Sequence, residues 1–124
     1  MTAQEYQAAG YKLSLQTDQA VIDGAEALVR AAYIVPIVGA FDEHDEDQVR
    51  AMMCLAYIRM SLAQIFATRS GGKEKNAAQS FTASREAVLQ EFARTADTYL
   101  RKLGDTKAVD DVLQIYFITN FLNL

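Results

Sequence analysis

The sequence predicts an all-α protein: a compact bundle of about four helices around a long central helix, preceded by a short extended N-terminal leader. Two observations carry this expectation. Apolar residues recur at helical spacing along most of the chain, and turn-forming residues are scarce, with 6 Gly and 1 Pro among 124 residues. A β-sandwich or barrel needs turn signals about every 8–12 residues. The sequence therefore favours helices over strands.

The length indicates a single helical domain, residues 1–124, with three segments. Residues 1–16 form a leader or arm, residues 17–104 a helical core, and residues 105–124 an apolar C-terminal segment. In the leader, apolar and polar residues alternate over YKLSLQ (11–16), a period typical of a half-buried extended segment. We expect this leader to dock on the core as an arm or edge strand, or to contact a neighbouring subunit.

The first helix of the core is expected to begin after Thr17, a suitable N-cap, and to end near residue 33. It ends there because Pro36 lacks an amide hydrogen and disfavours helix in the residue before it. Glu26 is assigned to the solvent side, where it should pair with Arg30 four residues later. The expected buried stripe consists of Val21, Ala25, Leu28 and Ala32, widened by Ile22, Val29 and Tyr33.

The second helix, over about residues 45–69, is the longest and is expected to be central. It is apolar around most of its circumference, which is typical of a helix packed on several sides. Burial against another subunit is the alternative. Its apolar residues include Met52, Met53, Leu55, Ile58, Met60, Leu62 and Phe66.

Two further helices are expected toward the C-terminus. After the loop SGGKEKN (70–76), a third helix should run from about residue 77 or 81 to Leu103, with Gly104 in the left-handed conformation that ends many helices. A fourth is expected over about residues 107–118. Residues from Ile115 onward are apolar and β-prone, so periodicity alone leaves strand as the alternative there.

The acidic run Asp42–Asp47, with five carboxylates and the single histidine His44, is the first candidate for chemistry. Asp45 followed by Gln48 resembles a capping box, and the helix dipole stabilises carboxylates at a helix N-terminus. A helix–loop–helix calcium site would need Gly at the sixth position and Glu at the twelfth, where Asp47 and Met53 stand. We favour a solvated helix start, with a weak divalent-cation site as the alternative.

Other motifs do not predict catalysis or a bound cofactor. The sequence GGKEK (71–75) lacks the first Gly and the Ser or Thr of a phosphate-binding loop. With one histidine, no Ser–His or Cys–His pair is available, and the expected core carries no Glu for a di-iron site. Cys54 is expected to be a small buried residue. We therefore expect no enzyme activity, no catalytic, metal or cofactor-binding residues, and no cofactor.

Charge and hydropathy limit the choice of partners. The net charge is −4, from 12 basic and 16 acidic residues, whereas nucleic-acid binding is usually marked by a basic patch. Arg85, Arg94, Arg101 and Lys102 are interpreted as an ion-paired solvent face. Uncharged stretches fall short of the ~18 residues of a membrane span, and no signal-peptide pattern is present. We expect a cytoplasmic protein without a membrane or sequence-specific nucleic-acid partner.

The apolar C-terminal segment is the best-motivated candidate for an interface. It is either part of the core or a surface that a second copy or another protein covers. The candidate interface residues are Ile115, Tyr116, Phe117, Ile118, Phe121, Leu122 and Leu124.

Three segments, in their order and spacing, carry a family resemblance over roughly residues 17–104. They are TDQAVIDGAEALVRAAY with its connector IVPIVG, then DQVRAMMCLAYIRMSLAQIF after the acidic turn, then SREAVLQEFARTADTYLRKLG. This layout resembles the small helical head–tail connector (adaptor) proteins of tailed bacteriophages and prophages. The C-terminal segment lies outside the resemblance, and no motif residues can be transferred individually.

The resemblance implies a non-enzymatic structural protein and virion component. It would form a ring or other homo-oligomer and dock on a portal or tail protein during virion assembly, lining part of the DNA exit channel. An acidic balance suits a surface past which DNA slides. The alternative function is a bacterial helical protein–protein interaction or regulatory module, and an enzyme or metal-binding helical bundle is the third hypothesis.

Overall fold

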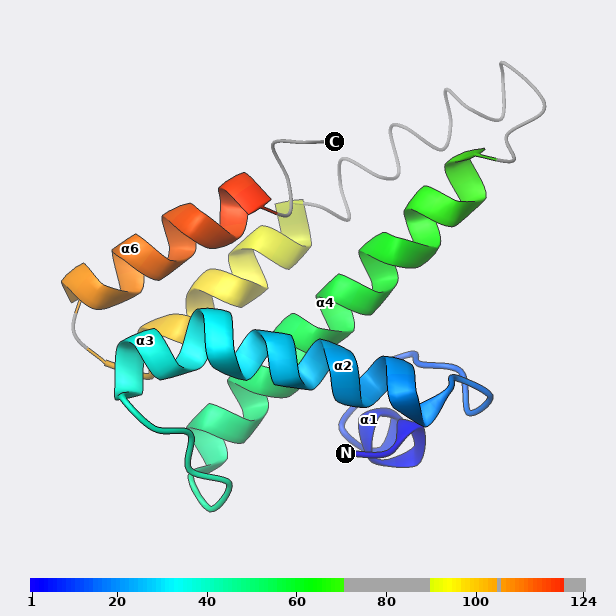
Figure 1. The fold of residues 1–124 in the computed structure, drawn as a ribbon, viewed down its shortest axis with the longest axis horizontal. Coiled ribbons are helices and arrows are strands. Elements are labelled where there is room, and N and C mark those ends of the chain that lie inside the picture. Colours follow the sequence, from blue (N-terminus) through cyan, green and yellow to red (C-terminus); the bar gives the residue numbers. More distant parts are fainter. Residues whose placement is uncertain (71–89, 105, 120–124) are drawn as a thin grey trace.

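The computed structural model describes residues 1–70, 90–104 and 106–119, and every regular element within these ranges is helical. The predicted all-α class is therefore confirmed. Figure 1 shows α2 crossing α4. It also shows α6 beside the 90–101 helix (yellow), to which the Arg101–Asp110 ion pair joins it. The elements are α1 (Ala3–Ala8), α2 (Gln19–Val29), the π-helix η1 (Arg30–Ile34), α3 (Val35–Val38), α4 (Glu46–Ser70), a helix over residues 90–101, and α6 (Thr106–Phe117).

The leader begins with a helix, so the prediction of an extended leader is wrong for its first half. Thr2 and Glu5 form a capping box at the start of α1: the Glu5 N–H donates to the Thr2 hydroxyl at 3.2 Å, and the Thr2 N–H donates to the Glu5 carboxylate at 3.0 Å. Gly10, at φ +96°, then turns the chain back. After this turn Leu13 is buried and Leu15 is 62% exposed.

The core side of α2 agrees only in part with the predicted stripe: Ile22, Ala25 and Val29 are buried as predicted, but Val21 and Leu28 are not. Val21 is 52% and Leu28 37% exposed, because the helix is rotated so that neighbouring positions face inward. Its N-cap is Asp18 rather than Thr17, since the Asp18 carboxylate accepts from the Ala20 N–H at 3.0 Å. The buried residues of α2 are Ile22, Ala25, Glu26 and Val29.

The chain stays helical past Pro36, so the predicted helix end near residue 33 is wrong. In η1 the Val35 N–H bonds to the Arg30 carbonyl, five residues earlier. This wider turn lies just before Pro36, which then stands in the first turn of α3, where a missing amide hydrogen costs little. Helix α3 ends at Gly39, whose φ is +88°.

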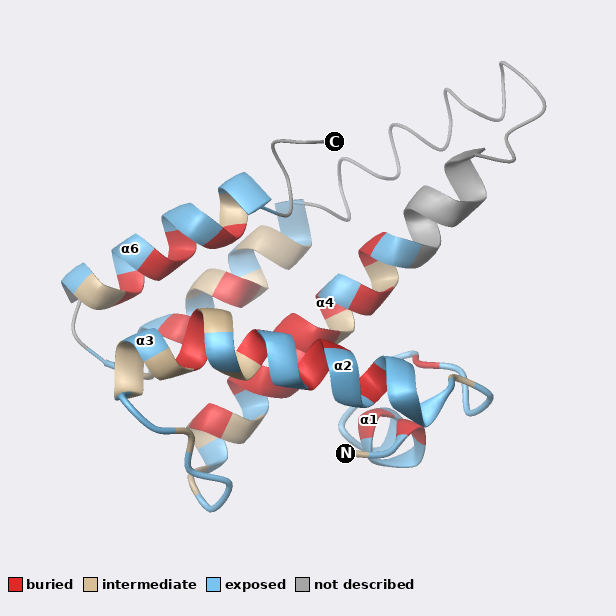
Figure 2. Ribbon diagram, in the orientation of Figure 1, coloured by how far each residue is buried: buried red, intermediate tan, exposed pale blue. Residues whose placement is uncertain are grey.

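Helix α4 begins where the sequence predicts and is packed on all sides near its middle. The Asp45 carboxylate accepts from the Asp47 N–H at 2.9 Å and caps the helix. Six consecutive residues, Ala51–Ala56, are all buried, and Figure 2 shows this part of α4 as an unbroken buried band. Consecutive burial leaves no solvent face, in agreement with the broadly apolar sequence.

Helix α6 confirms the predicted C-terminal helix and excludes the strand alternative for these residues. It packs on η1 and α3. Tyr116 meets Tyr33 edge to face, with ring centroids 5.1 Å apart. The described part of the predicted third helix is helical over residues 90–101. Its earlier residues and the preceding loop lie outside the described residues.

Gly104 serves packing and does not adopt the predicted left-handed conformation. Within the described ranges, Gly10 and Gly39 are the glycines with positive φ. A Cβ atom added at Gly104 would lie 2.9 Å from Ile37 Cγ2, so the absence of a side chain lets the chain pass close to α3. None of the helices in the described ranges has the length and apolar character needed to cross a bilayer.

Candidate interaction surface

Two isoleucines are exposed where α6 ends: Ile115 in its last turn and Ile118 just after Phe117. Ile115 is 55% and Ile118 47% exposed, and their three-residue spacing places them next to each other on one helical face. Tyr116, 1% exposed, belongs to the core because it lies on the side of α6 that packs on η1. Phe117 is half-buried, with its ring centroid 5.8 Å from that of Tyr116.

The remaining predicted interface residues, Phe121, Leu122 and Leu124, lie outside the described residues.

The sequence of α6 explains why these isoleucines face solvent. One side of the helix is buried and the opposite side is polar over its first two turns. That outer side changes from charged to apolar where it meets Ile115 and Ile118. The buried residues are Val109, Val112, Leu113 and Tyr116, and the exposed polar ones are Lys107, Asp110, Asp111 and Gln114.

The acidic run forms the start of α4 through hydrogen bonds to the backbone. The Asp42 N–H donates to Gln48 Oε1 at 2.7 Å, and Gln48 Nε2 donates to the Asp45 carboxylate at 3.3 Å. The Asp42 carboxylate accepts from the His44 N–H at 2.9 Å. Gln48 thus accepts from an N–H three residues before the N-cap Asp45, whereas in a standard capping box it would accept from the N–H of the N-cap itself.

The acidic run does not gather its side chains around one point. His44 and Glu43 are strongly exposed, with 3.7 Å between Nε2 and Oε1. Across the described residues, no group of three or more His, Cys, Asp or Glu side chains is placed to hold a metal ion. These contacts fit a solvated helix start.

The basic residues of the 90–101 helix are paired with carboxylates. Arg94 lies 3.5 Å from Glu91, and Arg101 lies 2.9 Å from Asp97 and 3.0 Å from Asp110. Asp110, with Asp97, raises the pKa of Arg101. The predicted ion pairing is therefore confirmed for Arg94 and Arg101, whereas Lys102 lies over the Tyr99 ring, with Nζ 5.4 Å from the ring centroid. Arg85 and the GGKEK loop fall outside the described residues.

A buried carboxylate that the sequence analysis placed on the surface joins the leader to α2. Glu26 is 3% exposed, and its Oε2 accepts from the Tyr6 hydroxyl at 2.7 Å. Its Oε1 lies 3.0 Å from the Met1 amine. Burial, and then the bond to Glu26, raise the pKa of Tyr6. The available sequence signal was that Glu26 falls between apolar positions of the buried side.

Arg30 does not form the predicted ion pair with Glu26. Its guanidinium instead donates to Met52 Sδ at 3.3 Å and lies 5.6 Å from the centroid of the Phe41 ring. The prediction failed because the Glu26 carboxylate is held by Tyr6 and Met1, while Arg30, the first residue of η1, contacts Met52 and Phe41 instead.

Cys54 is a core residue, as predicted. It is 1% exposed, and burial raises the pKa of its thiol to about 12. The thiol is therefore protonated near neutral pH, whereas a reactive cysteine requires the thiolate.

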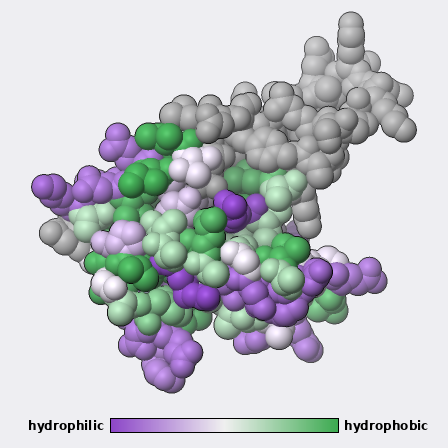
Figure 3. All heavy atoms as spheres, viewed as in Figure 1, coloured by the Kyte–Doolittle hydropathy of each residue, from purple (hydrophilic) through white to green (hydrophobic). Residues whose placement is uncertain are grey.

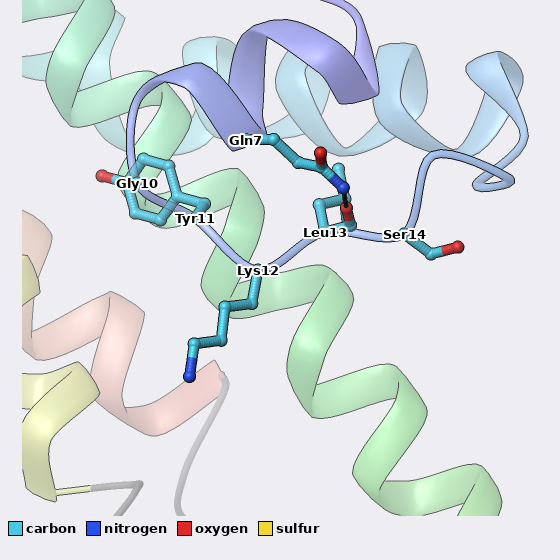
Figure 4. A pocket seen from close by; sticks show the side chains of 6 residues that line it. All are labelled: Gln7, Gly10, Tyr11, Lys12, Leu13 and Ser14. Atoms are coloured by element: carbon cyan, nitrogen blue, oxygen red, sulfur yellow. Dashed lines mark hydrogen bonds between the residues drawn. The ribbon is translucent and has the colours of Figure 1, made fainter.

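A shallow hollow lies beside the turn that follows α1 (Figure 4). The Gln7 side chain donates to the Leu13 carbonyl at 2.7 Å and closes this turn. Lys12 extends away from that hydrogen bond in Figure 4. The hollow results from the reversal of the chain at Gly10, and its polar side chains do not converge on one point. It is lined by Gln7, Gly10, Tyr11, Lys12, Leu13 and Ser14.

Comparison of the chain with protein-family models, curated proteins and solved structures found no match in any of the three. The class that the fold itself defines is an all-α protein of packed helices. Apolar side chains are exposed on α6 and on α2. The function is therefore argued from these surfaces.

Proposed function

We propose that this chain is a non-enzymatic structural protein: a phage or prophage head–tail connector (adaptor) that oligomerises and docks on the portal during virion assembly. The observation that carries the proposal is the exposed pair Ile115 and Ile118 at the end of α6. The resemblance of residues 17–104 to such connectors supports it. In the assembly, the isoleucine pair would be covered by a neighbouring copy or by the portal.

The energetic contribution of this pair is modest for each contact. Full burial of an isoleucine side chain contributes about 1.5–3 kcal/mol. Ile115 is 55% and Ile118 47% exposed, so a partner can cover about half of each residue. A partner that covered both would gain about 2–3 kcal/mol. In a ring every interface gains this term, since each copy presents the same surface to its neighbour.

The charge distribution is compatible with a channel-lining role. The chain carries a net charge of −4, and Arg94 and Arg101 are neutralised by adjacent carboxylates. Paired basic residues offer DNA little attraction, and excess negative charge repels its phosphates. A protein that lines a DNA exit channel must let the duplex slide without binding it.

The alternative function is a bacterial helical interaction or regulatory module. Exposed Val21 and Leu28 on α2 favour it, because an apolar helix face is a common docking surface for a partner helix. The two functions differ in assembly. A connector forms a large closed oligomer, whereas a regulatory module forms a small one or binds a partner helix.

The test is the solution mass by light scattering after size exclusion, over a hundredfold range of concentration. We expect growth from the chain mass of 13.7 kDa toward a closed oligomer. The double variant Ile115→Ser/Ile118→Ser should abolish the formation of this closed oligomer. Lys107→Ser/Gln114→Ser, a matched polar pair on the same helix, should not. A single-chain mass at every concentration would refute self-assembly, and a two-chain mass that never grows would favour the regulatory module.

A further inference from the structure

Helix α2 has an apolar side that faces away from its own core. We call this side the outer face of α2. Val21 is 52% and Leu28 37% exposed there, although both are large aliphatic residues. The face lies opposite the buried residues Ile22, Ala25 and Val29, and Figure 2 shows the outward side of α2 as exposed. Its residues, all exposed, are Ala20, Val21, Gly24, Ala27 and Leu28 of α2 together with Ala31 of the adjoining η1.

The positions on this face follow the spacing of a two-helix seam. Positions 20, 24, 27 and 31 are separated by four, three and four residues, as the core positions of a coiled coil are. Val21 and Leu28 lie together on one flank of this seam. Asp23 and Arg30 lie together on the other flank. Figure 3, which views this side of the molecule, shows hydrophobic and hydrophilic residues in adjoining patches.

Gly24, at the middle of the face, has no role in the packing of its own chain. A Cβ atom added there would meet nothing within 4 Å, and its φ is not positive, unlike those of Gly10 and Gly39. Glycine in a helix interior is destabilising relative to alanine. A second helix that approaches closely at this point would account for the missing side chain.

We propose that the outer face of α2 packs against the same face of a second copy of this chain, as an antiparallel helix pair. In this arrangement Gly24 lies opposite Ala27 of the second copy, and Ala20 lies opposite Ala31. Val21 then meets Leu28 of the second copy on one flank. Each small or apolar residue of this face thus meets a residue of the same face in the second copy, as a two-fold contact requires.

Charge complementarity on the other flank selects the antiparallel orientation. Asp23 of one copy comes beside Arg30 of the other, twice in the pair. A parallel pair would put both Asp23 carboxylates at one end and both Arg30 guanidiniums at the other. Arg30 is partly buried: it donates one N–H to Met52 Sδ, and its guanidinium lies 5.6 Å from the centroid of the Phe41 ring. To pair with Asp23 of the second copy it would use its other N–H donors. Asp23 is exposed and accepts from Gln19 at 2.9 Å.

The pair is expected to be weak because one helix from each copy forms a contact at the low end of specific interfaces. We therefore expect a dissociation constant in the micromolar range. The inference is separate from the proposed function because it uses α2 and not the isoleucine pair of α6. Either surface can fail its test while the other holds.

The first experiment is sedimentation velocity over a hundredfold concentration range with Gly24→Leu. A Cβ atom at this position meets nothing within 4 Å in the single chain, and leucine is a better helix former than glycine. The thermal midpoint of the monomer should therefore be unchanged or higher, while dimer affinity falls at least about tenfold as the close approach of the helices is blocked. Ile115→Ser/Ile118→Ser is the matched control and should leave the dimer intact.

The second experiment tests orientation through disulfide formation. An oxidised equimolar mixture of Gly24→Cys and Ala27→Cys chains should form the mixed disulfide in preference to either self-disulfide. Native Cys54 does not interfere because it is buried. The proposal is overturned if the wild-type chain sediments as a monomer throughout, if Gly24→Leu dimerises as well as wild type, or if the mixed disulfide has no preference.

Discussion

Replacing Tyr6 by phenylalanine tests whether the buried carboxylate of Glu26 fixes the leader to the helical core. The substitution removes one hydroxyl and leaves in place a ring that is 0% exposed. That hydroxyl donates to Glu26 Oε2 at 2.7 Å, in a site where Glu26 itself is 3% exposed. In the variant this oxygen is left without its donor, and the Met1 amine remains on the other oxygen at 3.0 Å.

The expected cost follows from the charge and burial of the acceptor. A hydrogen bond to a charged group contributes about 1.5–3 kcal/mol net, and a buried acceptor left unsatisfied bears its desolvation cost. Phenylalanine is slightly more apolar than tyrosine, which offsets a small part. We expect the free energy of unfolding to fall by about 2 kcal/mol, or roughly 8 °C in the unfolding midpoint for a domain of this size.

The assay is urea unfolding followed by circular dichroism, with Tyr57→Phe as the control. The Tyr57 ring contacts Tyr11 and Phe92, but its hydroxyl makes no hydrogen bond within the described residues, so the control should change stability by less than about 0.5 kcal/mol. Combining Tyr6→Phe with Glu26→Gln should cost less than the sum of the two. A Tyr6→Phe variant as stable as the Tyr57 control would refute the reasoning.

Three further predictions use the same unfolding assay or its variants. Gly104→Ala brings a Cβ to 2.9 Å from Ile37 Cγ2 and should cost about 1–3 kcal/mol; an unchanged stability would contradict the close contact. Asp45→Ala removes the cap of α4 and should cost about 1 kcal/mol, with faster amide hydrogen exchange at the start of that helix; equal exchange rates would count against the cap. The Cys54 thiol pKa is raised from 9.0 to about 12 by burial, so the unfolded thiol ionises first as the pH rises. Its contribution to stability should be intact below pH 9 and lost between pH 9 and 12, at up to about 1.4 kcal/mol per pH unit. Cys54→Ala should flatten that decline, and a slope equal to wild type would contradict the assignment.

The sequence predicted those elements whose signals are local and mutually consistent. Helix α4 has an acidic cap at Asp45 and apolar residues around most of its circumference, so the sequence predicted both where it starts and that it is buried. Helix α6 was predicted despite its β-prone end. The capping box of Thr2 and Glu5 is an equally local signal, and it would have predicted α1 within the leader.

The parts that were missed depend on contacts between distant residues. Glu26 was assigned to solvent because a carboxylate is costly to bury without partners, and its partners come from Tyr6 and Met1, 20 and 25 residues away. Pro36 was taken as a helix end because the wider turn of η1 has no marker in the sequence. The sequence could not predict whether Ile115 is exposed or buried, because this depends on which side of α6 packs against another helix.

The π-turn of η1 has a consequence for the lengths that this segment tolerates. A π-turn contains one residue more than the α-helical turn it replaces, so removing one residue between Arg30 and Ile34 would restore an ordinary helix. That deletion would rotate α3 by about 100° relative to α2 and carry Ile37 away from Gly104. The π-turn thus lets α2 turn its buried side toward α4 while α3 turns its half-buried side toward α6. A change in the number of residues in this segment is therefore expected to disturb the packing of α3 on α6 more than a conservative substitution within it.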